Sequence, residues 1–363
     1  MRKASILASV VGIALVVAAV VIRWGVAPAM VKLPGNTDTT RTYSGTAATL
    51  LNPTAIATGD ATHALAHDVP IVATHHDKVL KSHSGSSLVA DTKTLTAAGA
   101  QLSSSTYNYA VDRKDMGRGS GFNNVAVQNG ITFNFPIHTG KHDYTGWISD
   151  TSRTTTLKFS GTATRGGEHV YVFKTTAPAA PITDTQQLST LPKTLPSAQL
   201  PALATANGIS PTLLQSATAV LSQLPPNVPL AYTYQLDATY YVAPASGVVV
   251  DLVQHDVRSV GISGVSGLPT FPVADFTFTS TPASLKAAAS DARDKGNKIS
   301  LVESTLPLGL GIPGVIIAIA GIVMLNIRRR PEQMTLPPVE TTGRTVPQPR
   351  ETPTDAPTSA EQN

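Results

Sequence analysis

Residues 4–22 read ASILASVVGIALVVAAVVI and residues 306–327 read LPLGLGIPGVIIAIAGIVMLNI, two uncharged apolar runs near the ends of a 363-residue chain. At a rise of about 1.5 Å per residue, helices of these lengths would span about 28 Å and about 33 Å, against a hydrocarbon core of roughly 30 Å. Each run is long enough to cross a bilayer. The sequence therefore predicts two transmembrane α-helices that flank a mostly polar central region.

Basic residues lie on the outer side of both apolar runs. Arg2 and Lys3 precede the first run, and Arg328, Arg329 and Arg330 follow the second. Positive charges near the ends of membrane helices favour the cytoplasmic side. We therefore expect a two-pass protein of the plasma membrane, with both termini in the cytoplasm and the central domain outside it. The lipid bilayer is its first expected partner.

The first apolar run has an alternative interpretation as a cleavable signal peptide. Ala27-Pro28-Ala29 fits a small-x-small cleavage site after a basic start. Against cleavage, the run is longer than the usual ~7 to 15 apolar residues of a signal peptide, and Arg23-Trp24 resembles an interfacial anchor. If cleavage occurs, the second helix alone anchors the protein.

The composition changes along the chain in a way that predicts its domains. These are an N-terminal membrane helix (1–27), a β-rich domain (28–300) with a Pro-, Leu- and Ala-rich helical insert (178–229), a C-terminal membrane helix with its basic stop (301–330), and a cytoplasmic tail (331–363). The tail is rich in Pro and Thr and nearly lacks large apolar residues, which is typical of disorder.

Charge and cysteine content exclude several functional classes. Residues 28–300 contain 19 Lys and Arg and 17 Asp and Glu, a net charge of +2, so no nucleic-acid partner is expected. The chain has no cysteine, which rules out a thioether-linked lipid anchor, a CxxC redox site and thiolate metal ligands.

Alternating apolar and polar residues predict strands for most of the central domain. The clearest case is Gly130–Pro136, where Ile131, Phe133 and Phe135 would share one face. Further strands are predicted over 43–51, 69–80, 87–96, 105–111, 155–160, 169–175, 231–242, 248–253 and 275–280, with helices over 210–224 and 283–300. We expect a curved antiparallel sheet or open barrel with a helical insert, held between the two membrane helices.

Several segments resemble a family of actinobacterial envelope proteins. They are residues 130–137 (GITFNFPI), 144–147 (YTGW), 240–250 (YYVAPASGVVV) and the junction 287–307. Together with the two apolar ends, these segments are similar to the porin PorA family. The resemblance implies a cell-envelope protein of a mycolic-acid-bearing or related actinobacterium, but no established activity. Ala243 replaces an acid usual in the family, and 178–229 has no counterpart we can align.

The family's porin label can be tested against physical requirements. A transmembrane barrel needs strands of about 9 to 11 residues with an apolar outer face. The strands predicted here are mostly shorter, and neither apolar run carries an internal charge that would line a helical pore. A channel-forming or transporter-accessory protein therefore remains the alternative function.

Motifs for catalysis and metal binding are missing or incomplete. The sequence contains no GxSxG, HExxH, Walker A or SxxK motif, so we expect no enzyme, catalytic residue or cofactor. Five histidines lie within 21 positions (His63, His67, His75, His76 and His83), but their spacing matches no metal-binding pattern. We interpret them as a solvated strand face. A second loose group, His138, His142 and Asp143, is interpreted in the same way.

The favoured function is a non-enzymatic module that binds an envelope lipid or a partner protein. Its candidate surface is Ile131, Phe133, Phe135, Tyr232, Tyr234 and Tyr240, with ordinary core packing as the alternative. Small residues recur in the apolar runs at Ala8, Gly12, Gly314 and Ala318. Such stripes let helix backbones approach closely, so we expect the two helices to pack together or against further copies of the chain.

Overall fold

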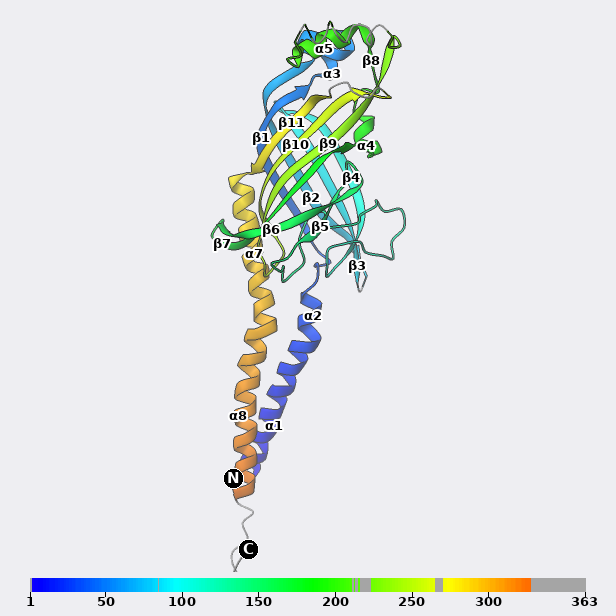
Figure 1. Ribbon diagram of the computed structural model, residues 1–363. Helices are drawn as coiled ribbons and strands as arrows, with labels where there is room; N and C mark the ends of the chain where they lie inside the picture. The colour runs from blue at the N-terminus through cyan, green and yellow to red at the C-terminus, as the bar shows by residue number, and fades with distance from the viewer. Residues whose placement is uncertain are drawn as a thin grey trace, which may run out of the picture.

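The computed structural model describes residues 2–83, 85–210, 212, 215, 223–264 and 270–327. A curled antiparallel sheet forms a half-barrel at one end of the molecule, and two long apolar helices extend from it (Figure 1). Both helices, over Lys3–Met30 and Pro282–Asn326, are long and apolar enough to cross a membrane. The expected fold class is confirmed.

Ten strands form one continuous antiparallel path in the order β4-β3-β2-β1-β11-β10-β9-β7-β6-β5, and β8 pairs with β9 beside this path. Their bounds are β1 Asp38–Leu51, β2 Leu65–Ser82, β3 Ser86–Ala97, β4 Ala100–Asp112, β5 Tyr144–Ile148, β6 Arg153–Arg165, β7 Glu168–Pro181, β8 Thr194–Pro196, β9 Asn227–Val242, β10 Val249–Ile262 and β11 Phe271–Ser280. Most neighbours along the sheet are also neighbours in sequence. The exceptions are β7 and β9, which have β8 between them in sequence, and β1 and β11, which join the two ends of the domain.

The strands are longer than the sequence predicted. Apart from β5 and β8, they contain 10 to 18 residues. In β2, the ladder runs beyond the predicted 69–80 into residues 65–68 and 81–82. The predicted strands were too short because backbone pairing with a neighbouring strand keeps such end residues in the sheet, whereas hydrophobic alternation marks only the apolar part of a strand.

The strand predicted at Gly130–Pro136 is also wrong. Ile131 makes one isolated bridge with Gly146, and the amide of Phe135 donates to the carbonyl oxygen of Gly247 at 2.9 Å. The segment bonds first to one strand and then to a distant turn, so no ladder forms. Its alternation arises because Ile131 and Phe135 are both buried in the same core cluster.

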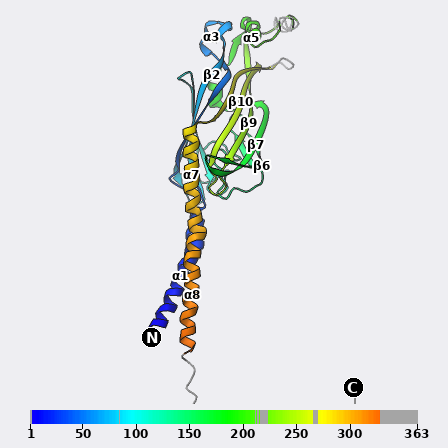
Figure 2. The ribbon, with the colours of Figure 1, turned by 90° about the vertical axis from the view of Figure 1, so that its left-hand side faces the viewer.

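The N-terminal helix consists of α1 (Arg2–Val21), a π-helical turn (Ile22–Val26) and α2 (Ala27–Met30). The C-terminal helix consists of α7 (Pro282–Ser300), a second π-helical turn (Leu301–Thr305) and α8 (Leu306–Ile327). The two π-helical turns contact each other where the helices leave the sheet. Figure 2 shows the C-terminal helix running from the sheet to the lower end of the molecule.

Helix α7 fastens the C-terminal helix to the sheet. Thr281 caps its N-terminus by accepting from the Ser284 amide at 3.2 Å, and the Ser284 hydroxyl accepts from the amide of Thr42 on β1 at 2.9 Å. Asp291 pairs with Arg41 of β1 at 3.1 Å. These contacts hold α7 at the point where β11 ends.

Backbone contact between α1 and α8 occurs at their glycines. A Cβ atom on Gly12 would lie 2.6 Å from the carbonyl oxygen of Gly314 and would collide with the amide nitrogen of Ala318. A Cβ on Gly321 would lie 2.8 Å from the amide nitrogen of Ser9. Ala8 is half-buried beside this contact. Gly12 and Gly321 therefore leave no room for a side chain.

The insert consists of short elements, and most of its predicted helix over 210–224 lies outside the described residues. The described elements near it are α3 Pro53–Thr58, the 3₁₀ turns Ala61–His63 and Ser197–Gln199, α4 Thr185–Ser189 and α5 Leu200–Ala206. Leu195, Leu200, Leu203 and Val228 form a small core with Leu65. Figure 1 places this core at the end of the sheet that is far from α1 and α8.

We predict that replacement of Gly12 by Leu separates α1 from α8. Because the chain has no cysteine, a reporter pair can be introduced without background. A Cβ on Gly311 would lie 3.5 Å from that of Ala19, which fits a disulfide. The variant Ala19→Cys/Gly311→Cys should crosslink within one chain under mild oxidation. Adding Gly12→Leu should reduce the yield several-fold, measured by gel mobility after cleavage between the helices.

The matched control is Ala19→Cys/Ile312→Cys. Ile312 is 57% exposed and faces away from α1, so this pair should give little intramolecular product. An unchanged crosslinking yield in the Gly12→Leu variant would contradict close backbone packing at this position.

Candidate functional site

A cavity of about 330 Å³ lies inside the half-barrel. Strands β1 to β4 and β9 to β11 line it, together with residues 132–134, residues 147–150 and the segment around α4. Its apolar lining includes Leu50, Leu95, Ile148, Leu191, Leu236, Val273, Phe276 and Phe278. A volume of this size falls in the range of about 300–1,000 Å³ typical of small-molecule sites.

The curl of the sheet leaves β4 and β5 as its two ends, and side chains span the gap between them. Tyr107 of β4 makes a side-chain hydrogen bond with Asp184, the residue that caps α4. Tyr109 of β4 makes one with Ser149, just after β5. Burial raises the pKa of Tyr109 to about 12, so the hydroxyl stays protonated. This open side of the half-barrel is therefore closed by side chains instead of a strand ladder.

A buried ion cluster lines one wall of the cavity. The Arg258 guanidinium lies 3.1 Å from the Asp150 carboxylate and 3.4 Å from that of Asp256, and it stacks over the rings of Tyr234 and Phe276. Burial raises the pKa of Asp256 to about 6, although Arg258 opposes this shift. One Asp256 oxygen has no hydrogen-bond partner among the described residues.

A second polar cluster lies on the part of the sheet formed by β2 and β3. The register places Asp77 opposite Asp91 and His75 opposite Lys93. His75 Nε2 lies 2.5 Å from Asp91 Oδ1 and 3.4 Å from Asp77 Oδ1, and Lys93 Nζ lies 3.5 Å from Asp91 Oδ2. His75, Asp77 and Asp91 form the one group of possible metal ligands within the described residues.

Burial and charge shift the pKa values of this second cluster in different directions. Burial opposes ionisation of both carboxyl groups, and it raises the pKa of Asp77 to about 6. The neighbouring His75 and Lys93 outweigh burial at Asp91 and lower the pKa of that carboxyl. Asp77 and Asp91 raise the pKa of His75 despite its burial. The His75–Asp91 pair is therefore ionised more readily than Asp77.

The structure separates the six residues of the predicted surface into two groups. Phe133, Tyr234 and Tyr240 line the cavity. Tyr232 is buried in the same core cluster as Tyr234 but does not line the cavity, and it donates its hydroxyl to the Pro192 carbonyl oxygen at 2.7 Å. Ile131 and Phe135 belong to a second core cluster. Half of the predicted surface therefore faces the cavity.

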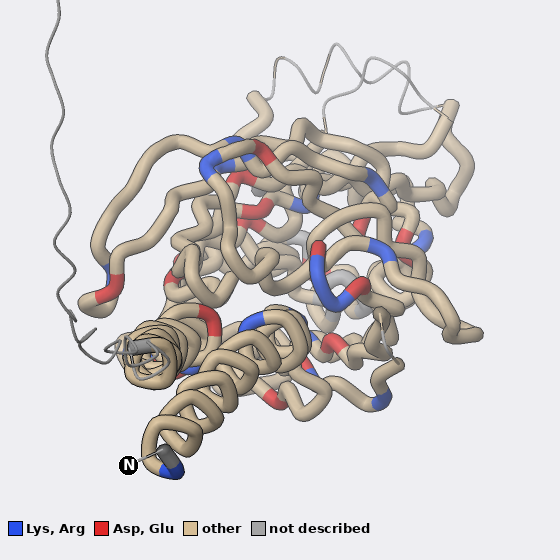
Figure 3. The backbone as a smooth tube through the Cα atoms, turned by 90° about the horizontal axis from the view of Figure 1, so that it is seen from below, with Lys and Arg blue, Asp and Glu red and all other residues tan. Residues whose placement is uncertain are grey.

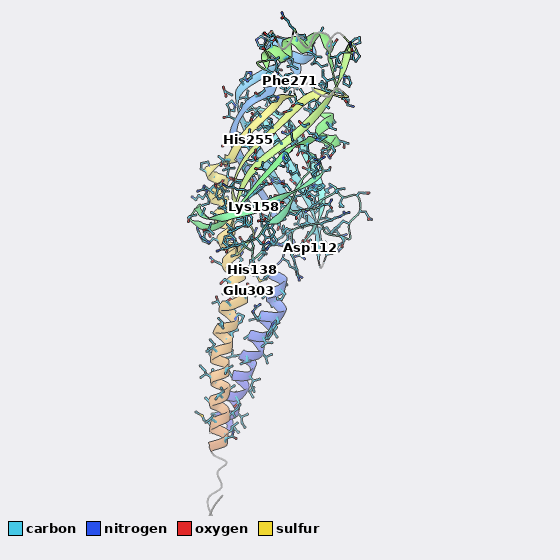
Figure 4. The ribbon with its side chains drawn as sticks, viewed as in Figure 1. Asp112, His138, Lys158, His255, Phe271 and Glu303 are labelled. Carbon is cyan, nitrogen blue, oxygen red and sulfur yellow. The ribbon has the colours of Figure 1, made fainter. Side chains whose placement is uncertain are left out.

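The histidines do not converge on one site. His63 pairs with Asp60 and His76 with Asp38, each at 2.7 Å, whereas His75 faces the cavity. His67 contacts the Ala48 carbonyl oxygen at 3.1 Å, and His83 stacks on Phe122. In the second histidine group, His138 pairs with Glu303 of the π-helical turn at 2.9 Å (Figure 4). His142 contacts the backbone of Asp143.

The sequence analysis did not identify the charged side chains of the cavity. Asp256 and Arg258 are two positions apart in β10, and Lys93 is two positions after Asp91 in β3, which places each pair on one face of its strand. This spacing was the available signal. It does not indicate whether the shared face is the inner or the outer face of the curled sheet. Viewed from below, acidic and basic positions are interspersed over the backbone (Figure 3).

Comparison with curated proteins gives no match. Among solved structures, a conserved hypothetical protein from Mycobacterium tuberculosis with a double hotdog fold shares 11% identity, over 73% of this chain and 80% of that protein. The TM-score is 0.14, so this likeness carries no structural argument. In the comparison with protein families, the family described as Porin PorA matches residues 4–323. This match extends from the first apolar helix to the second, and the chain belongs to the Porin PorA family.

Proposed function

We propose that the half-barrel binds an envelope lipid in its cavity and that the protein is a non-enzymatic lipid-binding module of the membrane. The cavity itself carries this proposal, because a concave site lined by apolar side chains with a few polar groups is what an amphiphilic ligand requires. The rings of Phe133, Tyr234 and Tyr240 provide flat apolar surface within it.

The distribution of polar groups favours an amphiphile over a purely apolar molecule. Arg258 and Lys93 present basic groups to the cavity, while Leu236, Val273 and Phe276 present only carbon. Acyl chains would displace water from the apolar wall, and a polar end group would hydrogen-bond to a charged cluster. A purely hydrocarbon ligand would displace water from these charged groups and offer them no hydrogen bond in return.

The two apolar helices would keep this cavity close to a membrane. Outward-facing side chains on α1 and α8 are large and apolar, among them Leu7, Val17, Ile316 and Met324. These helices are fastened to the sheet through α7 and the β1–β11 pair. We infer a two-pass arrangement with both termini in the cytoplasm, because the basic residues lie at the outer ends of the apolar runs.

Tryptophan quenching provides a direct test of lipid binding. Trp147 lines the cavity and Trp24 lies on the N-terminal helix, and these are the two tryptophans of the chain. In a Trp24→Phe background, a brominated fatty acid should quench Trp147 on binding. Ala73→Phe, which fills the cavity from β2, should weaken this binding by about tenfold or more, corresponding to about 1.4 kcal/mol.

The control is Val72→Phe, the adjacent position on the outer face of β2, where the side chain is 41% exposed. It should bind the probe as the parent protein does. Equal quenching in both variants, or none in the parent, would contradict the proposed site. Native mass spectrometry of the same full-length proteins in detergent would show whether a cellular lipid or a partner protein is lost from the Ala73→Phe variant.

The proposed topology has a separate test. Alkaline phosphatase, which folds only outside the cytoplasm, should be active when inserted after Gly208, in an exposed turn. The same enzyme fused after Asn363 should be inactive, while a reporter that works only in the cytoplasm should show the opposite pattern. Cytoplasmic activity of the insertion at Gly208 would contradict the arrangement.

A channel is the second candidate function, favoured by the name of the family. Two features oppose it. Strands β4 and β5 are not paired with each other in the described sheet, and an open sheet edge leaves backbone groups without partners in a bilayer. In addition, residues 4–22 and 306–327 contain no charged side chain.

Planar-bilayer recordings distinguish the two functions. If the cavity is a lipid site and the helices are anchors, full-length protein should produce no more conductance steps than detergent alone, at every protein concentration. Stepwise conductance that disappears when the Gly12→Leu variant is used would support a helical pore instead.

A further inference from the structure

We propose that His75, Asp77 and Asp91 form a binding site for a divalent transition-metal ion of the Zn²⁺ type. Their ligand atoms lie within 4.8 Å of one another on the adjacent strands β2 and β3, and His75 and Asp77 line the cavity. The sequence analysis predicted no metal site, because the spacing of the histidines matches no metal-binding pattern. Asp91 enters the site only through the pairing of β3 with β2.

The register of β2 and β3 places two carboxylates opposite each other, an arrangement that a bound cation would stabilise. Asp77 and Asp91 are directly opposite each other, and their side chains are almost fully buried, with 6% and 0% exposed. Like charges directly opposite on neighbouring strands destabilise a sheet. A bound cation would remove this repulsion and offset the loss of water from both carboxylates.

Unpartnered oxygens are the second observation that points to a ligand. Asp77 Oδ1 and Asp91 Oδ2 are buried without a close hydrogen bond, and the cationic atoms beside them, His75 Nε2 and Lys93 Nζ, lie at 3.4 Å and 3.5 Å. Leaving such an oxygen without a partner destabilises the folded protein, and more so when the group is charged. Two such atoms from facing residues indicate a site whose natural occupant is a positive ion.

The ligand set selects the class of metal. One imidazole nitrogen and two carboxylate oxygens suit Zn²⁺ and related ions, whereas Ca²⁺ and Mg²⁺ prefer oxygen ligands alone. The 3.4 Å between His75 Nε2 and Asp77 Oδ1 is close to the separation of about 3.3 Å that two ligands at about 2.0–2.1 Å make in a tetrahedron. The 2.5 Å between His75 Nε2 and Asp91 Oδ1 is that of a hydrogen bond, so a metal ion would replace the proton of this pair and widen it. Three protein ligands leave one position open.

Lys93 is the competing cation, and its position makes displacement feasible. Its ammonium group lies 3.5 Å from Asp91 Oδ2, yet 44% of its side chain is exposed to the cavity space. A flexible lysine can turn toward that space when a metal approaches. Its removal should therefore strengthen metal binding, which distinguishes a metal site from a purely structural ion pair.

The test uses full-length protein carrying a tag without histidine, purified in detergent and stripped with a chelator. Isothermal titration with Zn²⁺ should give one site per chain. His75→Gln and Asp91→Asn should each weaken binding by at least about tenfold, and Lys93→Met should tighten it. Ca²⁺ and Mg²⁺ should bind far more weakly than Zn²⁺.

The matched control is His76→Gln, at the neighbouring position on the other face of β2, where the imidazole pairs with Asp38 at 2.7 Å. It should leave Zn²⁺ affinity unchanged. Equal losses in His75→Gln and His76→Gln, or no saturable site in the parent, would overturn the proposal. Comparable affinity for Ca²⁺ would overturn the assignment to a transition metal.

A thermal measurement covers the case in which a variant folds poorly. Asp77→Asn preserves the shape of the side chain and removes one of the two facing charges. Without metal, this variant should therefore melt at a higher temperature than the parent, and Zn²⁺ should raise the melting temperature of the parent but not of the variant. A lower metal-free melting temperature together with an intact Zn²⁺ shift would contradict the site. These readouts need no lipid, so they are independent of the quenching test.

Discussion

The close pairing of β1 with β11 is the contact on which the arrangement of the molecule depends. It joins the first and last strands of the sheet at its centre, over Tyr43–Leu50 and Ala274–Ser280. Gly45 makes it possible, because a Cβ there would collide with the Thr277 carbonyl oxygen and lie 2.7 Å from Phe278 Cα. Strand β1 follows the N-terminal helix and β11 precedes the C-terminal one, so the pairing brings both helices to the same part of the sheet.

This central pair also explains how α1 and α8 meet. Helix α7 continues from β11 and is held to β1 by Arg41 and Ser284 before α8 begins. The two apolar helices therefore start close together, and Gly12 and Gly314 allow their backbones to touch. Contact between the helices and contact between the strands support each other, since each limits the separation of the same two chain ends.

The interior of the half-barrel combines apolar walls with buried charge. Arg258 pairs with both Asp150 and Asp256, although one Asp256 oxygen has no hydrogen-bond partner among the described residues. The cluster on β2 and β3 differs, because two carboxylates, Asp77 and Asp91, face each other directly. One cavity thus offers an apolar surface that suits a lipid and a separate polar group that suits a cation. The two proposed ligands would use different walls.

The terminal helices, the β-rich class of the domain and many of its strands could be predicted from the sequence, because these depend on apolar length and local alternation. The predicted strands 155–160 and 169–175 pair as β6 and β7, and 231–242 and 248–253 pair as β9 and β10. The family resemblance also came from short local segments. Tertiary structure alone decided that Asp91 lies opposite Asp77, that Asp150 reaches Arg258, and that Gly130–Pro136 is no strand. Those contacts join residues far apart in the chain, and strand register and sheet curvature bring them together.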